Sequence, residues 1–450
     1  MSAFQKMKPG TGFVTTHSGR AGILHDVLGA GGQGAVYAVE CEGTRFALKW
    51  YHPHVLNVDV SLRDRLTRAV HRGPPDNTFL WPIDFVEIRG QPSFGYLMPL
   101  RAQHLRCMRD LIARPPQRLE LDLATRLTVC VRIAESMLAL HAKGFCYQDI
   151  NFGNVFLDAD TGAVCICDND NVDVDGTPAG VYGTRKFMAP EVVRREALPS
   201  SRTDLFSMAV LFFYVLIGWH PLEGKREAEI PMMDAAGELS LYGSSPRFIF
   251  DPDDASNGPV PGYHDGVVAR WKALSVPLQA LFVRAFGPGL MSPEARVLET
   301  EWIAAMSQAM TAIQHCPNCG AEHVFDPRAR RIPPRACVAC ARPLPEPPHL
   351  LIGRQAVVLN ADGAVPLYAI SGGRPDRTRS GATVERHPSD PNVVGLCNRS
   401  ATAWTLRLPD GRSATVQPGR TFRLIDGAGI DFGGRKGLVR WRALSGAGAG

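Results

Sequence analysis

Residues 147–156 read YQDINFGNVF and residues 164–170 read VCICDND, and these two stretches decide the fold. Asp149 and Asn154 stand five positions apart, on a loop that follows a long apolar helix pattern. Asp168 comes at the end of a short apolar strand pattern. A magnesium triphosphate needs a few hard oxygen ligands, and Asn154 and Asp168 suit that role. Asp149 then remains to orient or deprotonate a hydroxyl nucleophile.

A glycine-rich stretch lies upstream of these residues. Residues 28–37 read LGAGGQGAVY, in which Gly29, Gly31 and Gly34 fit the spacing G-x-G-x-x-G. Glycine lets backbone N–H groups approach phosphate oxygens without a Cβ atom in the way. The pattern alone fits a hairpin turn equally well. Lys49, on the next predicted strand, favours the phosphate site because its ammonium group can neutralise phosphate charge.

The composition is that of a soluble globular protein with two or three domains, at 450 residues, 45% apolar and 21% charged. The net charge of +5 favours neither nucleic acid nor a membrane surface. Eleven cysteines cannot all pair, and their scatter suits a reducing compartment. The N-terminus lacks the apolar core of a signal peptide, and the run from Met208 to Trp219 is shorter than the about 20 residues that span a bilayer. We therefore expect a cytoplasmic protein without a membrane segment.

The hydrophobic periodicity changes along the chain. From about residue 22 to 103, short apolar runs alternate with glycine turns, which predicts a twisted antiparallel sheet. Helical spacing follows over residues 121–144, 203–217, 277–286 and 298–313. The sequence thus predicts an α+β fold in which a small β-rich part precedes a larger helical part.

Taken in order, these motifs resemble the eukaryotic-like (Hanks-type) protein Ser/Thr kinases. The run GTRKFMAPE, which ends at Glu191, resembles the end of a kinase activation segment, and Thr184 within it points to Ser or Thr as acceptor. Asp204 resembles the acid that anchors the catalytic-loop backbone. Arg296 lies where that family has an arginine that pairs with the glutamate, here Glu191.

The resemblance also implies a bilobal kinase fold, its ligands and its site residues. ATP and Mg²⁺ are the implied cofactors, and a protein with Ser or Thr is the implied substrate. The implied catalytic residues are Lys49, Asp149, Asn154 and Asp168, the last two as Mg²⁺ ligands. The implied ATP-binding residues are Leu28, Gly29, Gly31, Gly32, Gly34, Val36, Ala47, Lys49, Met98, Leu100 and Cys167. The implied regions are an N-terminal extension (1–21) and a kinase domain (22–313), with an N-lobe at about 22–98 and a C-lobe at about 102–313.

The catalytic motifs depart from that family in three respects. The usual His-Arg-Asp has Gln148 in place of the arginine that would grip a phosphorylated activation segment. The usual Asp-Phe-Gly reads Asp168-Asn169-Asp170. Asn151 stands where a lysine is usual, and Lys186 is a candidate substitute.

A fourth departure concerns the acid that usually pairs with the strand lysine. No glutamate lies between Lys49 and Glu87, so Asp64 is the nearest candidate, although it fits a solvated helix position equally well. These changes keep the nucleotide ligands, so we favour an active, atypical kinase. The alternative is a pseudokinase scaffold that binds nucleotide.

Two Cys-x-x-Cys pairs follow the helical part, with seventeen residues between them. This is zinc-ribbon spacing, and four thiolates leave no position open for substrate, so we predict a structural Zn²⁺ in a ribbon at 314–342. Disulfides or a rubredoxin-like iron are the alternatives. A basic loop between the pairs fits a solvated or docking face better than a nucleic-acid site. The ligands are Cys316, Cys319, Cys337 and Cys340, and the loop arginines are Arg328, Arg330, Arg331 and Arg335.

The remainder of the chain follows a proline-rich linker at 343–349. Residues 350–446 alternate like short strands broken by Asp-Gly turns, which predicts a small all-β sandwich. The run LIDGAGIDFG resembles the last strands of forkhead-associated domains, which bind phosphothreonine. Gly353, Arg354 and Asn398 resemble remnants of that family's binding residues, but its Ser-x-x-His element is not evident. We therefore favour a β-sandwich for protein contacts.

The combination of YQDINFGN, DND and a CPNCG ribbon is similar to bacterial kinases grouped with tellurite-resistance-type von Willebrand A proteins and a PP2C-like phosphatase. That resemblance implies a reversible phosphorylation unit in signalling or stress response. The von Willebrand A-domain protein and the phosphatase are its implied partners.

Overall fold

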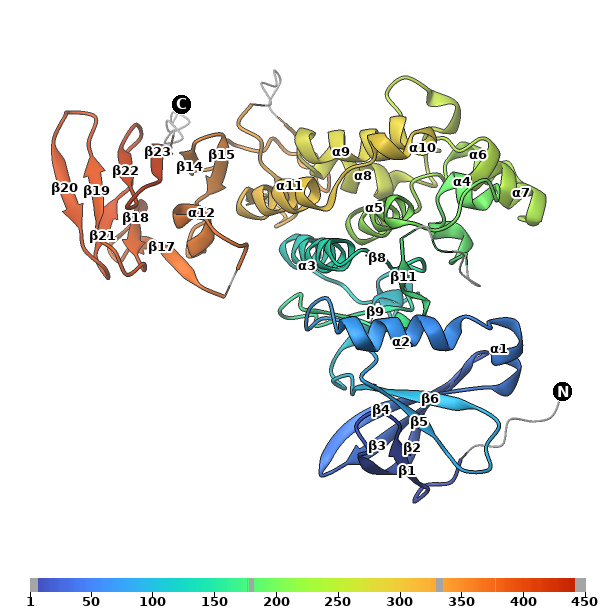
Figure 1. Cartoon of the computed structure of the whole chain (residues 1–450). Helices are drawn as coiled ribbons and strands as arrows, with labels where there is room; N and C mark the ends of the chain where they lie inside the picture. Colours follow the sequence, from blue (N-terminus) through green and yellow to red (C-terminus); the bar gives the residue numbers. More distant parts are fainter. Residues whose placement is uncertain (1–6, 176, 178–181, 329–334, 377, 442–450) are drawn as a thin grey trace. The chain divides into compact units, whose positions relative to one another are not determined.

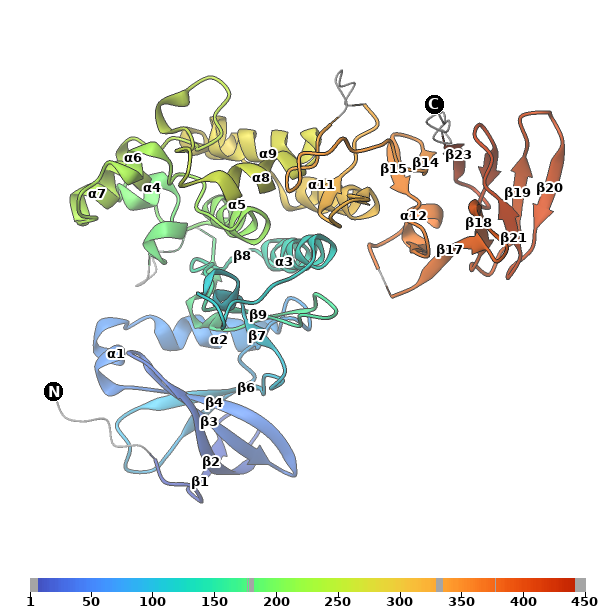
Figure 2. The same ribbon diagram turned by 180° about the vertical axis from the view of Figure 1, so that it is seen from behind.

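The computed structural model describes residues 7–175, 177, 182–328, 335–376 and 378–441 (Figures 1 and 2). Arg330 and Arg331 of the predicted basic loop lie outside these residues. Contacts divide the chain into two compact units. Unit 1 holds Met1–Leu121, Val129–Tyr263 and Phe282–Trp302, and unit 2 holds Asp122–Thr128, His264–Leu281 and Ile303–Gly450.

A closed antiparallel sheet opens unit 1, with the strand order β1-β2-β3-β4-β6-β5 (Figure 1). Side chains alternate along it, so Leu24, Tyr37, Leu48 and Trp50 are buried in one cluster. The predicted antiparallel sheet is therefore confirmed. Its strands are β1 (Gly12–Thr15), β2 (Ala21–Ala30), β3 (Gly34–Cys41), β4 (Thr44–Tyr51), β5 (Asp84–Glu87) and β6 (Phe94–Pro99).

Two helices follow β4, namely α1 (Pro53–Val58) and α2 (Leu62–Arg72). The buried residues of α2 are Leu62, Arg65, Leu66 and Ala69, which is the spacing of one helix face. In both views α2 lies between the strands and the helical region of unit 1 (Figures 1 and 2). An arginine such as Arg65 is rarely buried in this way.

The rest of unit 1 is mainly helical. Its most buried helix is α5 (Ser201–Ile217), which a Ser200–Thr203 capping box begins and Gly218 ends in the left-handed conformation (φ 76°). The other helices here are α4 (Pro190–Val193), α6 (Lys225–Ala228), α7 (Ala235–Leu239) and α10 (Pro288–Met291). The short strands are β7 (Arg106–Cys107), β8 (Phe145–Cys146), β9 (Val155–Leu157), β10 (Val164–Ile166) and β11 (Asp173–Val174).

Four further helices are α3 (Leu123–Ala142), α8 (Asp265–Ala273), α9 (Val276–Phe286) and α11 (Glu299–Thr311). Of these, α3, α9 and α11, together with α5, confirm the four helices predicted from hydrophobic spacing. Among the described residues, none of the helices combines the length and the apolar character that crossing a bilayer requires.

Unit 2 continues with a hairpin and two antiparallel sheets. The hairpin pairs β12 (Ile313–His315) with β13 (Glu322–Val324). One sheet has the order β15-β14-β23-β22-β19-β20 and the other β16-β17-β18-β21. The elements are β14 (His349–Ile352), β15 (Gln355–Val358), β16 (Ala364–Pro366), α12 (Leu367–Ser371), β17 (Ser380–His387), β18 (Asp390–Asn398), β19 (Trp404–Arg407), β20 (Ser413–Val416), β21 (Thr421–Arg423), β22 (Gly429–Asp431) and β23 (Lys436–Arg440).

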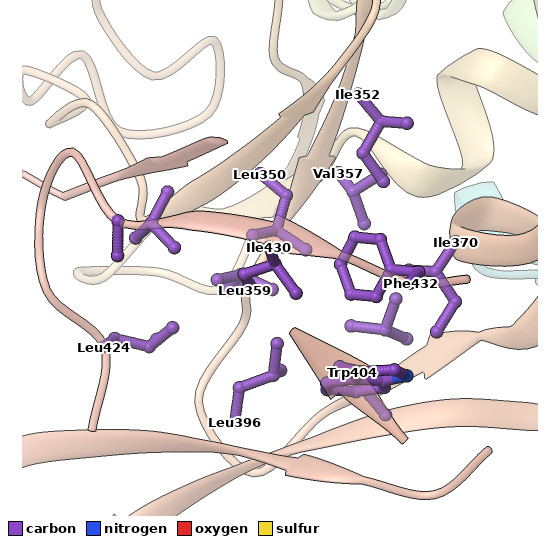
Figure 3. Close-up of a cluster of buried hydrophobic side chains, with 14 of the residues drawn as sticks. Leu350, Ile352, Val357, Leu359, Ile370, Leu396, Trp404, Leu424, Ile430 and Phe432 are labelled. Atoms are coloured by element: carbon purple, nitrogen blue, oxygen red, sulfur yellow. The ribbon is translucent and has the colours of Figure 1, made fainter. Parts of the chain in front are cut away.

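One buried cluster takes side chains from both sheets of unit 2 (Figure 3). Leu350 and Ile430 come from the six-stranded sheet and Leu396 from the four-stranded one, and all three belong to the same cluster as Trp404. The helix α12 departs from the all-strand prediction. Ala369 and Ile370 of α12 belong to the same buried cluster. Packing of these apolar residues therefore stabilises a short helix where the sequence pattern predicted a strand.

Candidate active site

A cavity of about 400 Å³ opens in unit 1 between the glycine-rich strands and the segment that ends at Asp168. This volume falls in the range of small-molecule sites, about 300–1,000 Å³. Most of the predicted ATP-binding residues line it. These are Leu28, Gly29, Val36, Ala47, Lys49, Met98, Leu100 and Cys167, with Asn154 and Asp168 at the same wall.

The glycines of the loop between β2 and β3 play different parts. Gly31 and Gly32 are exposed and do not line the cavity, and a Cβ atom on either would meet open space. At Gly34, by contrast, a Cβ atom would lie 2.1 Å from the carbonyl oxygen of Trp50. The requirement for glycine at position 34 therefore comes from the close approach of β3 to β4.

Lys49 is buried, and its ammonium group donates to two carboxylates. Nζ donates to Asp168 and lies 2.7 Å from Oδ2 of Asp170, with Oε1 of Gln33 at 3.2 Å. Burial opposes the charge of Lys49, but Asp170 and Asp168 outweigh burial and raise its pKa above the ordinary value. Lys49 is therefore a fixed cation at the back of the cavity.

The prediction that Asp64 pairs with Lys49 does not agree with this geometry. Asp64 is exposed on α2, because the buried face of that helix carries Arg65 and Leu66 instead. The carboxylate that joins Asp168 at Lys49 is Asp170, from the segment after β10. Asp64 is a solvated helix residue in this structure.

The catalytic-loop residues are held by backbone contacts. The carboxylate of Asp204 accepts from the backbone N–H groups of Tyr147 (2.5 Å) and Gln148 (2.9 Å). The side-chain amide of Asn154 donates to the carbonyl oxygen of Asp149 at 2.9 Å. Oδ1 of Asp149 accepts from both the backbone N–H (2.9 Å) and the hydroxyl (2.8 Å) of Thr184. The loop thus brings together Asp149, Asn154 and the activation-segment threonine.

The residues at the metal end fit Mg²⁺. The backbone N–H of Cys167 donates to the carbonyl oxygen of Asn154 at 2.8 Å, which ties together the segments that carry the two predicted metal ligands, Asn154 and Asp168. Asp168 has a left-handed backbone (φ 56°), an uncommon conformation that structures retain at functional sites. A carboxylate and an amide oxygen at one wall of a cavity are the hard donors that Mg²⁺ prefers.

One predicted contact and one candidate residue lie at the predicted activation segment. Nη2 of Arg296 donates to Glu191 at 2.8 Å, so the structure brings that pair together. The ammonium of Lys186, whose side chain is 49% exposed, donates to Glu223 at 2.7 Å, and its part as a substitute for the lysine missing at Asn151 stays a prediction.

Sequence reasoning missed Asp170, Tyr51 and Gln33 at Lys49. Asp170 was visible as the second aspartate of the DND motif. Tyr51 stands two residues after Lys49 on β4, a spacing that places both side chains on one face of the strand. Gln33 gave no signal beyond its place in the glycine-rich loop.

The four cysteines of the two pairs converge in unit 2. Their sulfur atoms all lie within 4.8 Å of one another, with Sγ–Sγ distances of 3.7 Å for Cys316–Cys340 and 3.6 Å for Cys319–Cys337. Zn–S bonds of about 2.3 Å in a tetrahedron place sulfur atoms about 3.8 Å apart. All four thiols are free, so the arrangement fits a tetrahedral metal site.

Comparison with known proteins agrees with the geometry of unit 1. Residues 105–249 match the family model for the protein kinase domain, so the chain contains such a domain. Among curated proteins, it is similar to serine/threonine-protein kinase pkn2 of Myxococcus xanthus (26% identity over 61% of this chain and 34% of that protein). It is also similar to CBL-interacting protein kinase 4 of Oryza sativa subsp. japonica (30% identity, 32% and 31%) and to serine/threonine-protein kinase SCH9 of Candida albicans (29% identity, 27% and 16%). The chain thus spans about a third or less of the length of these relatives.

Proposed function

We propose that the chain is an ATP- and Mg²⁺-dependent protein kinase that phosphorylates Ser or Thr. One observation carries the proposal. Lys49, Asn154 and Asp168 line one cavity, and the carbonyl oxygen of Asp149 accepts a hydrogen bond from the side chain of Asn154. A cation, two oxygen donors for a metal and a carboxylate for a hydroxyl are the groups that phosphoryl transfer requires.

The contacts of each residue define its part in the reaction. Bound MgATP would supply the phosphoryl group. Lys49 would hold phosphate oxygens as an ammonium group, and Asn154 and Asp168 would hold the metal. Oδ1 of Asp149 accepts two hydrogen bonds from Thr184 (2.9 and 2.8 Å), whereas Oδ2 accepts one longer hydrogen bond from the amide of Asn154 (3.3 Å). Oδ2 is therefore the oxygen that would take the proton of the acceptor hydroxyl.

The choice of Ser or Thr rests on the contact between Thr184 and Asp149 and on the names of the relatives. The activity is tested by incubating the chain with γ-labelled ATP, Mg²⁺ and general acceptor proteins, followed by phosphoamino-acid analysis. We expect label in phosphoserine and phosphothreonine that EDTA abolishes. Label in phosphotyrosine alone would overturn the acceptor assignment, and no labelled product in any acceptor would overturn the kinase itself.

The parts outside the kinase domain support a wider proposal. The four-cysteine cluster would hold a structural Zn²⁺ in a ribbon. The sheets that follow would form a β-sandwich for protein contacts, because one buried cluster takes side chains from both sheets. A phosphopeptide role is not favoured, because the amide of Asn398 is buried and donates to the carbonyl oxygens of Thr402 (2.8 Å) and Val416 (3.1 Å). An amide held internally in this way is not available to a phosphopeptide.

The resemblance to bacterial kinases grouped with von Willebrand A-domain proteins and PP2C-like phosphatases extends this proposal to its partners. We propose a cytoplasmic unit in which the kinase and the phosphatase act on a shared protein substrate. Phosphosite mapping after incubation with ATP and with those two kinds of protein is the test. Sites that the kinase adds and the phosphatase removes are expected, and sites that the phosphatase leaves untouched would contradict a reversible unit.

A further inference from the structure

Asp170 occupies the last position of the Asp168-Asn169-Asp170 motif and is almost fully buried (2% exposed). Its Oδ2 accepts from Nζ of Lys49 at 2.7 Å and from the hydroxyl of Tyr51 at 2.5 Å. Its Oδ1 is buried without a hydrogen-bond partner among the atoms that the structure describes. A buried carboxylate with hydrogen bonds to only one of its two oxygens lowers stability, so a role of Asp170 in the site would account for it.

Helix α2 approaches the same place with a cation. Nε of Arg65, which is 2% exposed, donates to the backbone carbonyl oxygen of Asp170 at 3.0 Å, and its guanidinium pairs with Asp59. One turn further along, Arg68 pairs with the buried Asp173 at 2.7 Å. Thus α2 contacts the segment after β10 through arginines, and its one acid, Asp64, faces solvent.

Helix α2 therefore gives Lys49 no acidic partner, and the carboxylates that hold Lys49 come from the segment after β10. We propose that Asp170 is the positioning residue of Lys49, the fixed carboxylate that holds the ammonium group in register with the phosphates. This inference rests on the proposed kinase activity. Asp168 also contacts Lys49, but its side chain is 36% exposed and is the expected metal ligand. Asp170 is buried, so it is the carboxylate that stays with Lys49 when a metal occupies Asp168.

A second consequence concerns α2. Lys49 and both of its carboxylate partners belong to β4 and to the segment after β10. The helix therefore supports the site through the Arg65 contact with the Asp170 backbone, and an acid on α2 is not needed to complete it. Charge on the exposed face of α2 should accordingly have no effect on nucleotide binding.

A double-mutant cycle tests this inference in the full chain. Asp170→Asn keeps the size of the side chain and removes its charge, Lys49→Met removes the cation, and Asp64→Asn is the matched control on α2. The readouts are kcat, the KM for MgATP, and the equilibrium affinity for MgADP. Because misplacing one catalytic group by about 1 Å can cost about 100-fold, we expect Asp170→Asn to lower kcat at least about tenfold. We also expect it to weaken MgADP binding by about tenfold, because Lys49 would no longer be held against the phosphate oxygens. We expect Asp64→Asn to change each readout less than about twofold.

The cycle separates positioning from general stability. In the Lys49→Met background, Asp170→Asn should change MgADP affinity less than about twofold, because its effect acts through Lys49. Equal losses in both backgrounds, or an Asp170→Asn variant as active as Asp64→Asn, would overturn the inference. A parent chain without phosphoryl transfer would instead overturn the proposed function. Should Asp170→Asn not fold, Asp170→Glu enters the same cycle, and its smaller loss must again vanish with Lys49→Met.

Discussion

Replacing Arg296 with methionine removes a buried cation that joins the end of the activation segment to the helical part of unit 1. The guanidinium of Arg296 donates to Glu191 at 2.8 Å and to the carbonyl oxygens of Arg202 (2.9 Å) and Gly289 (3.1 Å). Methionine keeps the apolar stem and leaves these acceptors without their donor. Breaking one partner of a buried ion pair costs about 3–5 kcal/mol. The side chain of Glu191 is 13% exposed, so we expect a loss near the lower end, about 3 kcal/mol.

The assay is urea unfolding followed by tryptophan fluorescence. Arg202→Met is the matched control, because the side chain of Arg202 pairs with Glu294 at the surface (44% and 77% exposed). Its loss should cost less than about 1 kcal/mol. Arg296→Lys keeps the charge but not the planar set of donors, so it should fall between the two. If Arg296→Met is no less stable than Arg202→Met, the buried network does not hold this segment.

Three further predictions concern pH, backbone packing and the metal. Burial opposes charge on His141, but hydrogen bonds to two carboxylates raise its pKa to about 9. Relative to an unfolded pKa of about 6.5, the stability it contributes is complete below about pH 6.5 and is lost as the pH rises through about 9. The difference in unfolding free energy between the parent and His141→Gln should therefore shrink by up to about 3 kcal/mol over that range, and a constant difference would contradict it. Gly34→Ala should cost about 2 kcal/mol or more in urea unfolding, because the new Cβ meets the carbonyl of Trp50, whereas Gly31→Ala should be near neutral; equal costs would argue against the close approach. Metal analysis should find zinc in the purified chain and its loss in Cys340→Ser, while iron would indicate the rubredoxin-like alternative.

The proximity of Asp149 and Asn154 could be predicted from the sequence because the two residues lie close together along the chain. Asp149 and Asn154 are five residues apart on one loop, and the amide of Asn154 reaches the carbonyl oxygen of Asp149 directly. The long helices could be predicted for a similar reason. Every residue of α5 from Thr203 to Ile217 is buried, so a continuous apolar run was enough to indicate this helix.

The partner of Lys49 could not be predicted in the same way. Lys49 and Asp170 are 121 residues apart, and only the fold brings them together. The sequence left two positions open for Asp64, one turned inward to Lys49 and one in solvent. The helix buries Leu62, Leu66 and Ala69, and that face carries Arg65 inward and Asp64 outward. A local pattern cannot decide which charged neighbour a hydrophobic face will bury.

The most direct measurement of the central claim is the rate of γ-phosphoryl transfer by Asp149→Asn at saturating MgATP. Because Oδ2 of Asp149 is the proposed proton acceptor, the rate should fall by about 10²- to 10⁴-fold, while the affinity for MgADP stays within about twofold of the parent. A variant that binds nucleotide normally and transfers phosphate at the parent rate would contradict the site described here.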